Sequence, residues 1–405
     1  MLTAFILNEE IKGLNKDLTM GFTVNPKGYR VCSSLNASLA NVIKWALMED
    51  EDVIFCISDH IQSTPPCYEK LESLIFDVVA EGIYFLYVEA EYAEQVIVNE
   101  NYIAIDGISS VSSFILTRPI FKLALSILEN NNFVNHMSWL NFLSILSPHA
   151  FAISENSTAC QKRINFHIIS PFRNAAKFLP DYVSSIQAQV STNYNVYLID
   201  DCSTDKGASC VKENTTFKMY TNINRQYALQ NILNILLTEK IADDDVVCLV
   251  DADDRLPHKY VLNILQTIYQ DESLLLTYGS TSIINEYSKW GQPYYESDFE
   301  NIRKSQWKAS HMRTFKYKVF KKFIELDPTL KLFRDKHGNL LRMPYDMAIL
   351  LPLFELAGFD KTKFIYTPTY EYRLHSNNDH SINRKQQFDG EKEVRRKKGL
   401  KRYNF

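Results

Sequence analysis

The sequence contains little glycine and proline, 12 and 13 in 405 residues, so it is neither a collagen-like repeat nor a chain dominated by linkers. It also has no excess of positive charge. Its 44 Lys and Arg stand against 48 Asp and Glu, a formal net charge of -4, which excludes a uniformly basic nucleic-acid binder. Hydrophobic residues make up 46% of the chain, enough for a sizeable core. We therefore expect a folded protein of two to three domains.

The chain has seven cysteines and no Cys-x-x-Cys pair, which argues against a disulfide framework or a zinc ribbon. We expect reduced, mostly buried thiols. No apolar run is long enough to cross a bilayer, and the first residues lack the basic segment of a signal peptide. These features predict a cytoplasmic protein, and they leave open a peripheral contact at the inner face of the membrane.

Three apolar strands alternate with two amphipathic helices in the second half of the chain. The strands are expected at Ile164–Phe172, Asn195–Asp205 and Asp243–Asp254, and the helices at Ala176–Gln189 and Arg225–Lys240. Strands and helices that alternate with short connections predict an α/β fold with a mostly parallel sheet flanked by helices. In such sheets, polar residues just beyond the strand ends form the ligand crevice.

The first half of the chain contains a segment similar to one in the second half. Asn41–His60 aligns with Asn231–Asp254, since both read as an apolar-faced helix, an acidic turn and a strand. Either the domain is repeated, or two unrelated α/β units look alike. The polar stretch Ser154–Arg163 separates the halves, so we predict domains at residues 1–155 and 160–383. The first segment ends in Ser58, Asp59 and His60, and we therefore interpret residues 1–155 as a degenerate, non-catalytic domain.

Three carboxylates, Asp251, Asp253 and Asp254, follow the apolar strand Val246–Val250, with Ala252 between them. Carboxylates this close repel one another, and a divalent cation is a common reason for such a cluster. Mg²⁺ or Mn²⁺ held by carboxylates and phosphate oxygens serves nucleotide substrates. The alternative is an ordinary polar turn, because Asp is frequent in turns. We predict the metal site.

A second acidic turn, with Asp200 and Asp201, follows the strand before it. Because neighbouring parallel strands end at the same edge of a sheet, we expect both turns to share one crevice. A carboxylate there can accept hydrogen bonds from a base or from ribose hydroxyls. Asp205 in the same turn is equally well explained as an Asx-turn at the start of the next helix.

The ordered segments Ser170–Gln189, Tyr197–Asp205 and Leu249–Asp254 resemble the family 2 glycosyltransferases. The resemblance covers residue 164 to about residue 380. It implies two tandem Rossmann-like domains of the GT-A type, with a nucleotide-sugar donor, UDP in our prediction. It also implies Mn²⁺ or Mg²⁺ as the cofactor, held by Asp253, Asp254 and His375. The donor-binding residues implied are Pro171, Phe172, Arg173, Asp200, Asp201, Arg225, Asn231, Asp251, Ala252 and Arg313. Arg225 replaces the family's glycine, so contacts in its loop are open.

A helix predicted at Arg342–Gly358 starts with Pro344 and places Asp346 in its first turn. The positive end of the helix dipole favours the ionised carboxylate there. By resemblance, Asp346 is the catalytic base that deprotonates the acceptor hydroxyl for a single, inverting displacement. The alternative is a helix-start acid that only stabilises the helix. His375 has a similar alternative, since a lone histidine is often structural. Arg313, in the segment Lys308–Lys316, could face a phosphate.

The C-terminal residues 384–405 are strongly basic, with nine Lys or Arg and three Asp or Glu from Arg384 to Arg402. We expect a solvated tail that could contact anionic lipid or nucleic acid. The predicted function is an inverting, metal-dependent glycosyltransferase that acts on a glycan or on a lipid-linked acceptor, as in polysaccharide biosynthesis. Two alternatives remain, namely transfer to hydroxylated bases of DNA and a non-catalytic scaffold that binds nucleotide sugars or glycans.

Overall fold

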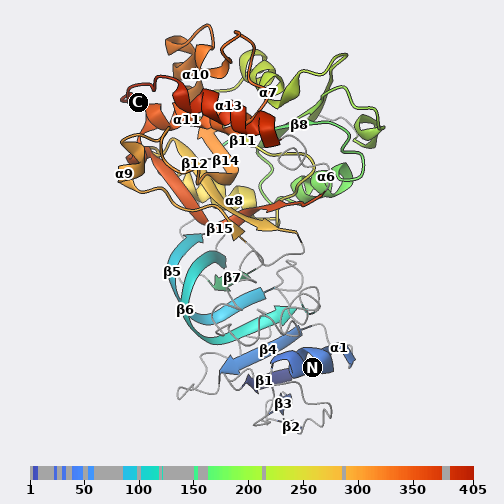
Figure 1. Cartoon of the computed structure of the whole chain (residues 1–405). Coiled ribbons are helices and arrows are strands. Elements are labelled where there is room, and N and C mark those ends of the chain that lie inside the picture. The colour runs from blue at the N-terminus through green and yellow to red at the C-terminus, as the bar shows by residue number, and fades with distance from the viewer. Residues whose placement is uncertain are drawn as a thin grey trace. The chain divides into compact units, whose positions relative to one another are not determined.

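In the computed structural model, residues 163–405 are described except for 212–215, 285–288 and 376–383. From the first part of the chain, 3–7, 22–24, 30–32, 39–48, 53–58, 85–97, 102–117, 121 and 150–153 are described. The chain divides into two compact units, Met1–Ala159 and Cys160–Phe405 (Figure 1). The predicted boundary stretch lies, except for Arg163, outside the described residues, as do Asp59 and His60.

The first unit contains a seven-stranded sheet in the order β2-β3-β1-β4-β6-β5-β7. Its elements are β1 (Thr3–Leu7), β2 (Phe22–Val24), β3 (Arg30–Cys32), α1 (Leu39–Met48), β4 (Val53–Ser58), β5 (Phe85–Ile97), β6 (Tyr102–Thr117) and β7 (Ala150–Ile153). The prediction of a mostly parallel sheet is wrong here, because β6 pairs antiparallel with β4, β5 and β7. Only four residues connect the long strands β5 and β6, and so short a connection can join only antiparallel strands.

The second unit contains the sheet β10-β9-β8-β11-β14-β12-β13, with β15 paired to β12. Its strands are β8 (Phe166–Phe172), β9 (Tyr194–Asp200), β10 (Phe217–Thr221), β11 (Val246–Leu249), β12 (Leu276–Ile283), β13 (Lys289–Trp290), β14 (Ser310–Lys316) and β15 (Thr362–Tyr372). The predicted parallel strands are confirmed, since β8 pairs parallel with β9 and β11. The sheet as a whole is mixed, because β14 runs antiparallel to both β11 and β12.

Helices cover both faces of this sheet. The helices are α6 (Leu179–Gln187), α7 (Tyr227–Thr238), α8 (Val261–Ile268), α9 (Glu296–Phe299), α10 (Tyr317–Leu326), α11 (Tyr345–Ala357) and α13 (Arg384–Arg396), with short 3-10 turns at Gly207–Cys210, Lys331–Phe333 and Phe359–Lys361. Side chains alternate along β8: Ile169 packs in the core formed with α7, α10 and α11, whereas Ser170 bonds to Tyr182 of α6 at 2.6 Å. The strand is therefore buried on both faces, which explains its continuous apolar run.

The prediction of a solvated C-terminal tail is wrong for α13, which packs against α11. Val394 is fully buried in the core. The backbone carbonyl of Val394 accepts a hydrogen bond from Arg303 Nη1 at 2.7 Å, and Arg303 also pairs with Glu355 of α11 at 2.6 Å. Arg395 donates to the carbonyl of Arg303 at 2.8 Å. The basic side chains of this segment thus partly serve the fold, and the apolar Val394 holds the helix down.

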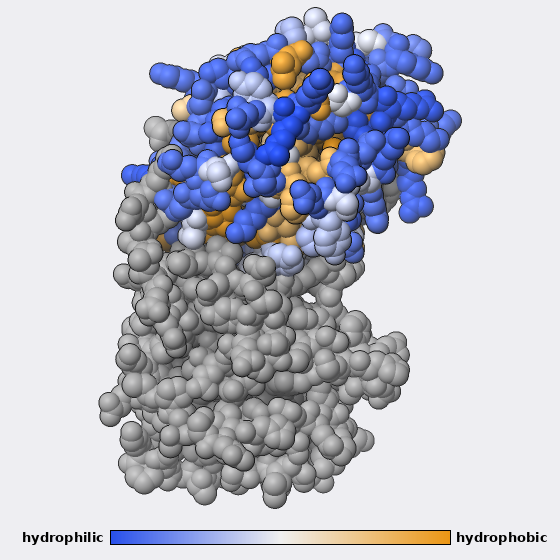
Figure 2. Space-filling view, turned by 90° about the vertical axis from the view of Figure 1, so that its left-hand side faces the viewer, coloured by the Kyte–Doolittle hydropathy of each residue, from blue (hydrophilic) through white to orange (hydrophobic). Residues whose placement is uncertain are grey.

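The face of the second unit seen in Figure 2 is mostly hydrophilic, with apolar side chains in patches among charged ones. No helix among the described residues is long and apolar enough to cross a membrane.

Candidate active site

A cleft of about 1030 Å³ opens where the loops after β8, β9 and β11 meet the start of α11. Twelve of the fourteen side chains predicted for the site line it: Pro171, Phe172, Arg173, Asp201, Arg225, Asn231, Asp251, Ala252, Asp253, Arg313, Asp346 and His375. The two that do not line it are Asp200 and Asp254. Segments that are far apart in sequence therefore converge as expected at the carboxyl ends of the parallel strands.

The loops after β8 and β9 are bound to each other. Asn174 donates its backbone N–H to Ser203 Oγ at 2.9 Å and accepts from the Thr204 N–H at its side-chain Oδ1, at 2.8 Å. Asn174 has φ 55°, a left-handed conformation that asparagine tolerates better than most residues. Asp205 forms the Asx-turn that was the structural alternative, accepting from the Gly207 N–H at 3.1 Å. These bonds fix one wall of the cleft.

Asp200 and Asp201 have different surroundings. Asp200 accepts from the Ser203 N–H at 2.8 Å and so closes its own turn. Asp201 accepts from Gln226 N at 2.6 Å, Tyr227 N at 2.9 Å and Asn222 Nδ2 at 3.0 Å. Burial opposes its ionised form, but these hydrogen bonds outweigh burial and lower the pKa of Asp201. Asp201 is thus an ionised carboxylate that holds the loop before α7.

Asn231 and Arg225, the other predicted residues near this loop, also lie at the cleft. Asn231 is fully buried, and its Oδ1 accepts from Asn222 Nδ2 at 2.7 Å. Arg225 lies 3.9 Å from Asp201 and is 40% exposed. Asn231 therefore holds the loop before α7 through its hydrogen bond with Asn222, whereas the guanidinium group of Arg225 remains accessible in the cleft.

Asp251 and Asp253 present carboxylates to the cleft after β11. Asp251 accepts a 2.6 Å hydrogen bond from the hydroxyl of Tyr345, and Asp253 lies 3.0 Å from His375 Nε2. Burial, followed by repulsion from Asp253, raises the pKa of Asp251 to about 7, although Tyr345 and Arg313 act against the shift. The acidic turn itself therefore concentrates more negative charge than its immediate hydrogen-bond partners offset.

Asp254 does not point into the cleft and is fully buried. Its Oδ2 accepts from the Tyr370 hydroxyl and its Oδ1 from the Arg373 N–H, both at 2.7 Å. Tyr370 in turn accepts from the Asp251 N–H at 3.0 Å. Burial and the two neighbouring acids raise the pKa of Asp254 well above its usual value. Its two hydrogen bonds fasten the acidic turn to the end of β15.

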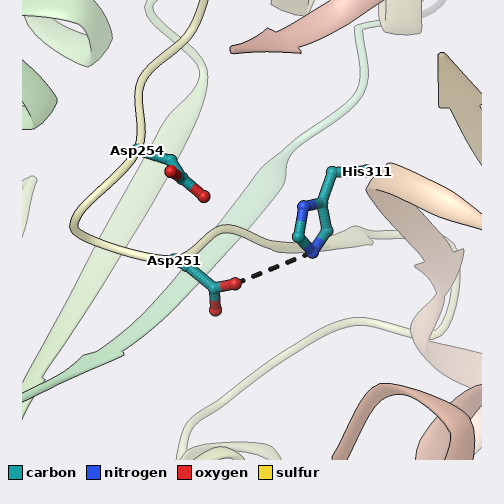
Figure 3. Close-up of side chains that lie close together, drawn as sticks. All are labelled: Asp251, Asp254 and His311. Carbon is teal, nitrogen blue, oxygen red and sulfur yellow. Dashed lines mark ion pairs between the residues drawn. The ribbon is translucent and has the colours of Figure 1, made fainter. Parts of the chain in front are cut away.

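The predicted metal ligands Asp253, Asp254 and His375 do not form one set. Within the described part of the chain, the residues whose ligand atoms lie within 4.8 Å of one another are Asp251, Asp254 and His311 (Figure 3). Asp253 and His375 form a separate pair. Figure 3 shows His311 facing Asp251, 3.7 Å away. These oxygen and nitrogen atoms are of the kinds that bind divalent cations, but both oxygens of Asp254 already accept hydrogen bonds.

His311 and Arg313 come from β14, beside β11. His311 is buried, and burial followed by the nearby Arg313 charge lowers its pKa well below the usual value. Its Nε2 contacts Arg313 Nη1, so the neutral ring accepts a hydrogen bond there. A cation that used this nitrogen would compete with Arg313. The carboxylates of Asp251 and Asp253 are therefore the principal candidate ligands on the cleft side.

Asp346 lies in the first turn of α11 and pairs with Arg313 at 2.8 Å. Burial opposes the charge of Arg313, but Asp346 and, after it, Tyr345 and Asp251 together outweigh burial and raise the pKa of the guanidinium group. Arg313, which was predicted to bind the donor, thus pairs with Asp346 in this structure. The pair holds the carboxylate of Asp346 at the cleft wall.

Sequence reasoning missed two tyrosines. Tyr345 and Tyr370 donate to Asp251 and Asp254, and strong burial raises the pKa of both hydroxyls well above the usual value. The only sequence signal was position, since Tyr345 precedes Asp346 and Tyr370 lies near His375. Neither position indicates that the tyrosine hydroxyl donates a hydrogen bond to a carboxylate about a hundred residues earlier in the chain.

Residues 167–326 match the family model Glycosyl transferase family 2. This segment is a family 2 glycosyltransferase domain. The match runs from β8 to the end of α10, less than half of the chain, and contains the two acidic turns and Arg313. Asp346 and His375 lie beyond it. Among curated proteins, none matches the sequence.

Solved structures resemble the chain only distantly. S. aureus TarS has a TM-score of 0.39 and 15% identity, over 55% of this chain and 39% of TarS. The mannosyltransferase PcManGT from Pyrobaculum calidifontis, solved with GDP-Man and Mn²⁺, has a TM-score of 0.40 and 16% identity, over 61% of this chain and 68% of its own. GalNAc-T7, solved with UDP, GalNAc and Mn²⁺, gives 0.37 and 15%, over 64% and 53%. The chain therefore spans about two fifths of TarS.

Proposed function

We propose that the second unit transfers a sugar from a nucleotide-sugar donor to an acceptor hydroxyl with inversion at the anomeric carbon. One observation carries the proposal: the acidic turn after β11 and the first turn of α11 form one cleft inside a unit that contains the family 2 domain. Tyr345 connects the two directly, since its hydroxyl donates to Asp251 and the next residue is Asp346. The acids proposed for the donor side, Asp251 and Asp253, and the candidate base Asp346 therefore line the same cleft.

In the proposed reaction, Asp346 accepts the proton of the acceptor hydroxyl. The acceptor oxygen forms its bond to the anomeric carbon from the face opposite the nucleotide, as the bond between that carbon and the diphosphate oxygen breaks. One displacement inverts the configuration, and the nucleotide diphosphate leaves with the bonding electron pair. Arg313 orients the carboxylate of Asp346 through their ion pair at 2.8 Å.

We propose that Asp251 and Asp253, with His375 beside Asp253, hold Mn²⁺ or Mg²⁺. When bound, such an ion neutralises charge on the leaving diphosphate, in place of a general acid. For the donor we propose a UDP-sugar. Asp201 binds its own loop through three protein donors, so Phe172 and Arg173, which line the same wall, are left for direct contact with the nucleoside.

The test compares Asp346→Asn with the wild-type chain, and Asp243→Asn at an exposed position serves as the control. A panel of UDP- and GDP-sugars with Mn²⁺ is screened for donor turnover, and calorimetry with UDP and Mn²⁺ measures binding. We expect Asp346→Asn to bind UDP normally and to lose about 10²- to 10⁴-fold in turnover. Equal turnover would remove Asp346 as the base. No turnover of any donor, with no metal-dependent binding of a nucleotide, would leave the scaffold alternative.

For the acceptor we propose a glycan or a lipid-linked glycan, reached from the cytoplasmic side of the membrane. Transfer to hydroxylated DNA bases is the second candidate, favoured by exposed basic residues of the C-terminal segment such as Arg384, Lys385 and Lys398. Duplex binding that weakens steeply with salt would support it, and salt-independent or absent binding would exclude it.

For the first unit we propose a degenerate, non-catalytic domain of the same type. In its support, β4 lies between a parallel β1 and an antiparallel β6, as β11 lies between a parallel β8 and an antiparallel β14. Loss of donor turnover on deletion of residues 1–159, in a protein whose second unit still unfolds cooperatively, would contradict a purely accessory role.

A further inference from the structure

Two guanidinium groups lie over one aromatic ring in the cleft. The Cζ of Arg225 is 4.3 Å from the ring centroid of Tyr227, and the Cζ of Arg342 is 4.7 Å from it. Tyr227 begins α7, whereas Arg342 precedes α11, and all three side chains line the cleft. The backbone N–H of Tyr227 is bound to Asp201 at 2.9 Å. The backbone of Tyr227 is thus anchored, and the face of its ring attracts both cations.

Carboxylates of the described residues neutralise these two cations only weakly. Among the described residues, no carboxylate lies within 4.0 Å of Arg342. Arg225 approaches Asp201 only to 3.9 Å, and Asp201 already accepts three shorter hydrogen bonds. By contrast, two other cations of the cleft are paired, Arg313 with Asp346 and Lys308 with Asp298. Two guanidinium groups beside one ring repel each other, and an anion between them would remove that repulsion.

The charge of the cleft allows a further anion beside the donor. Five cationic side chains line its described part, Arg173, Arg225, Lys308, Arg313 and Arg342, against the four carboxylates of Asp201, Asp251, Asp253 and Asp346. A divalent cation and the diphosphate of a nucleotide sugar, about two charges each, cancel. Loading with donor and metal therefore leaves the cleft as positive as before.

We propose that Arg342 and Arg225 bind a phosphate or carboxylate group of the acceptor, an inference that rests on the proposed function. Arg342 lies four residues before Asp346, on the segment that enters α11, and the reacting hydroxyl must reach Asp346. The acids after β11 lie at the donor side. A guanidinium group binds phosphate or carboxylate through two parallel N–H donors, so the pair would select acceptors that carry such a group near the reacting sugar.

The experiment uses inorganic phosphate as the probe and the full-length chain saturated with UDP and Mg²⁺, so that the diphosphate site is already filled. Calorimetry compares the wild-type protein with Arg342→Gln, Arg225→Gln and Lys385→Gln. Lys385→Gln makes the same charge change at an exposed position of α13. We expect phosphate to bind the UDP-loaded protein, with at least about tenfold weaker binding in either arginine variant and unchanged binding in the lysine variant. The Kd of UDP should not change in Arg342→Gln.

Three results would overturn the inference. Phosphate that competes with UDP would be using the diphosphate site. An equal loss of UDP affinity in Arg342→Gln would assign this residue to the donor. Phosphate binding unaffected by both arginine variants would exclude the pair. Should no nucleotide bind at all, the proposed function fails by itself, and the same variants titrated with phosphate alone still decide the anion site. A parallel titration with glucuronate distinguishes carboxylate from phosphate as the preferred group.

Discussion

Gly390 of α13 allows this helix to approach the segment that leads to Asp346. A Cβ atom at residue 390 would lie 1.8 Å from the carbonyl oxygen of Met343 and 3.2 Å from Cδ of Pro344. The obstacle is backbone, which cannot turn aside as a side chain can. Gly390→Ala therefore forces either α13 or the Met343–Pro344 segment to move.

Two effects of opposite sign determine how much Gly390→Ala changes the free energy of unfolding. Alanine is favoured over glycine inside a helix by about 1 kcal/mol. Overpacking costs about 1–3 kcal/mol, and we expect the upper end because α13 is anchored by the buried Val394 and by its bond from Arg303. The net loss in the free energy of unfolding is then about 1–2 kcal/mol. For a unit of this size, that lowers Tm by roughly 2–8 °C.

Calorimetric unfolding of the full-length chain measures this effect, with Asp389→Ala as the matched control. Asp389 precedes Gly390 in the same helix but is exposed, so its change to alanine alters helix propensity without a clash. We expect Asp389→Ala to leave Tm unchanged or to raise it slightly. A Gly390→Ala protein as stable as this control would refute the close packing of α13 on the segment before Asp346.

Other changes test the buried electrostatics. Arg303→Ala should lower the free energy of unfolding by about 3–5 kcal/mol, because it leaves the carboxylate of Glu355 without its cation; Lys322→Ala, which breaks the solvent-accessible pair with Glu325, should lower it far less. Since burial raises the pKa of Asp251 to about 7, the metal-free folded chain holds a proton that the unfolded chain releases. This group therefore lowers stability as pH rises from about 4 to 7, and Asp251→Asn should raise Tm at pH 8 but not at pH 4. Tyr345→Phe should weaken metal-dependent donor binding about tenfold, measured as donor KM, because Asp251 loses its hydrogen bond.

The sequence was sufficient to predict those parts of the second unit whose signals are local. The apolar runs of β8, β9 and β11 and the acids that follow them indicated a sheet edge with a shared crevice, and the structure brings Asp201, Asp253 and Asp346 to that cleft. Which acid of a pair faces the ligand was not predictable. Asp253 and Asp254 are neighbours, yet one faces the cleft and the other is buried under Tyr370.

The C-terminal segment was misinterpreted for a different reason. Its composition is that of a solvated tail, because most of its charges do face solvent. It is held by single contacts with distant residues: Val394 packs in the core, and Arg303, which pairs with Glu355 of α11, donates to the Val394 carbonyl. Counting charges cannot reveal that a residue some ninety positions earlier, Arg303, binds this segment. One buried valine is also too weak a periodic signal to indicate a packed helix.

The acidic turn after β11 accepts hydrogen bonds from residues that come later in the chain than the family 2 match. Asp251 and Asp254 carry raised pKa values because burial and mutual repulsion oppose their charge. The groups that offset this are Tyr345 at the start of α11, and Tyr370 with the Arg373 N–H at the end of β15. All of them lie beyond residue 326, where the match ends. The cleft is therefore complete only when α11 and β15 are packed against the segment that matches family 2, and one residue step on α11, from Tyr345 to Asp346, connects the acidic turn to the candidate base.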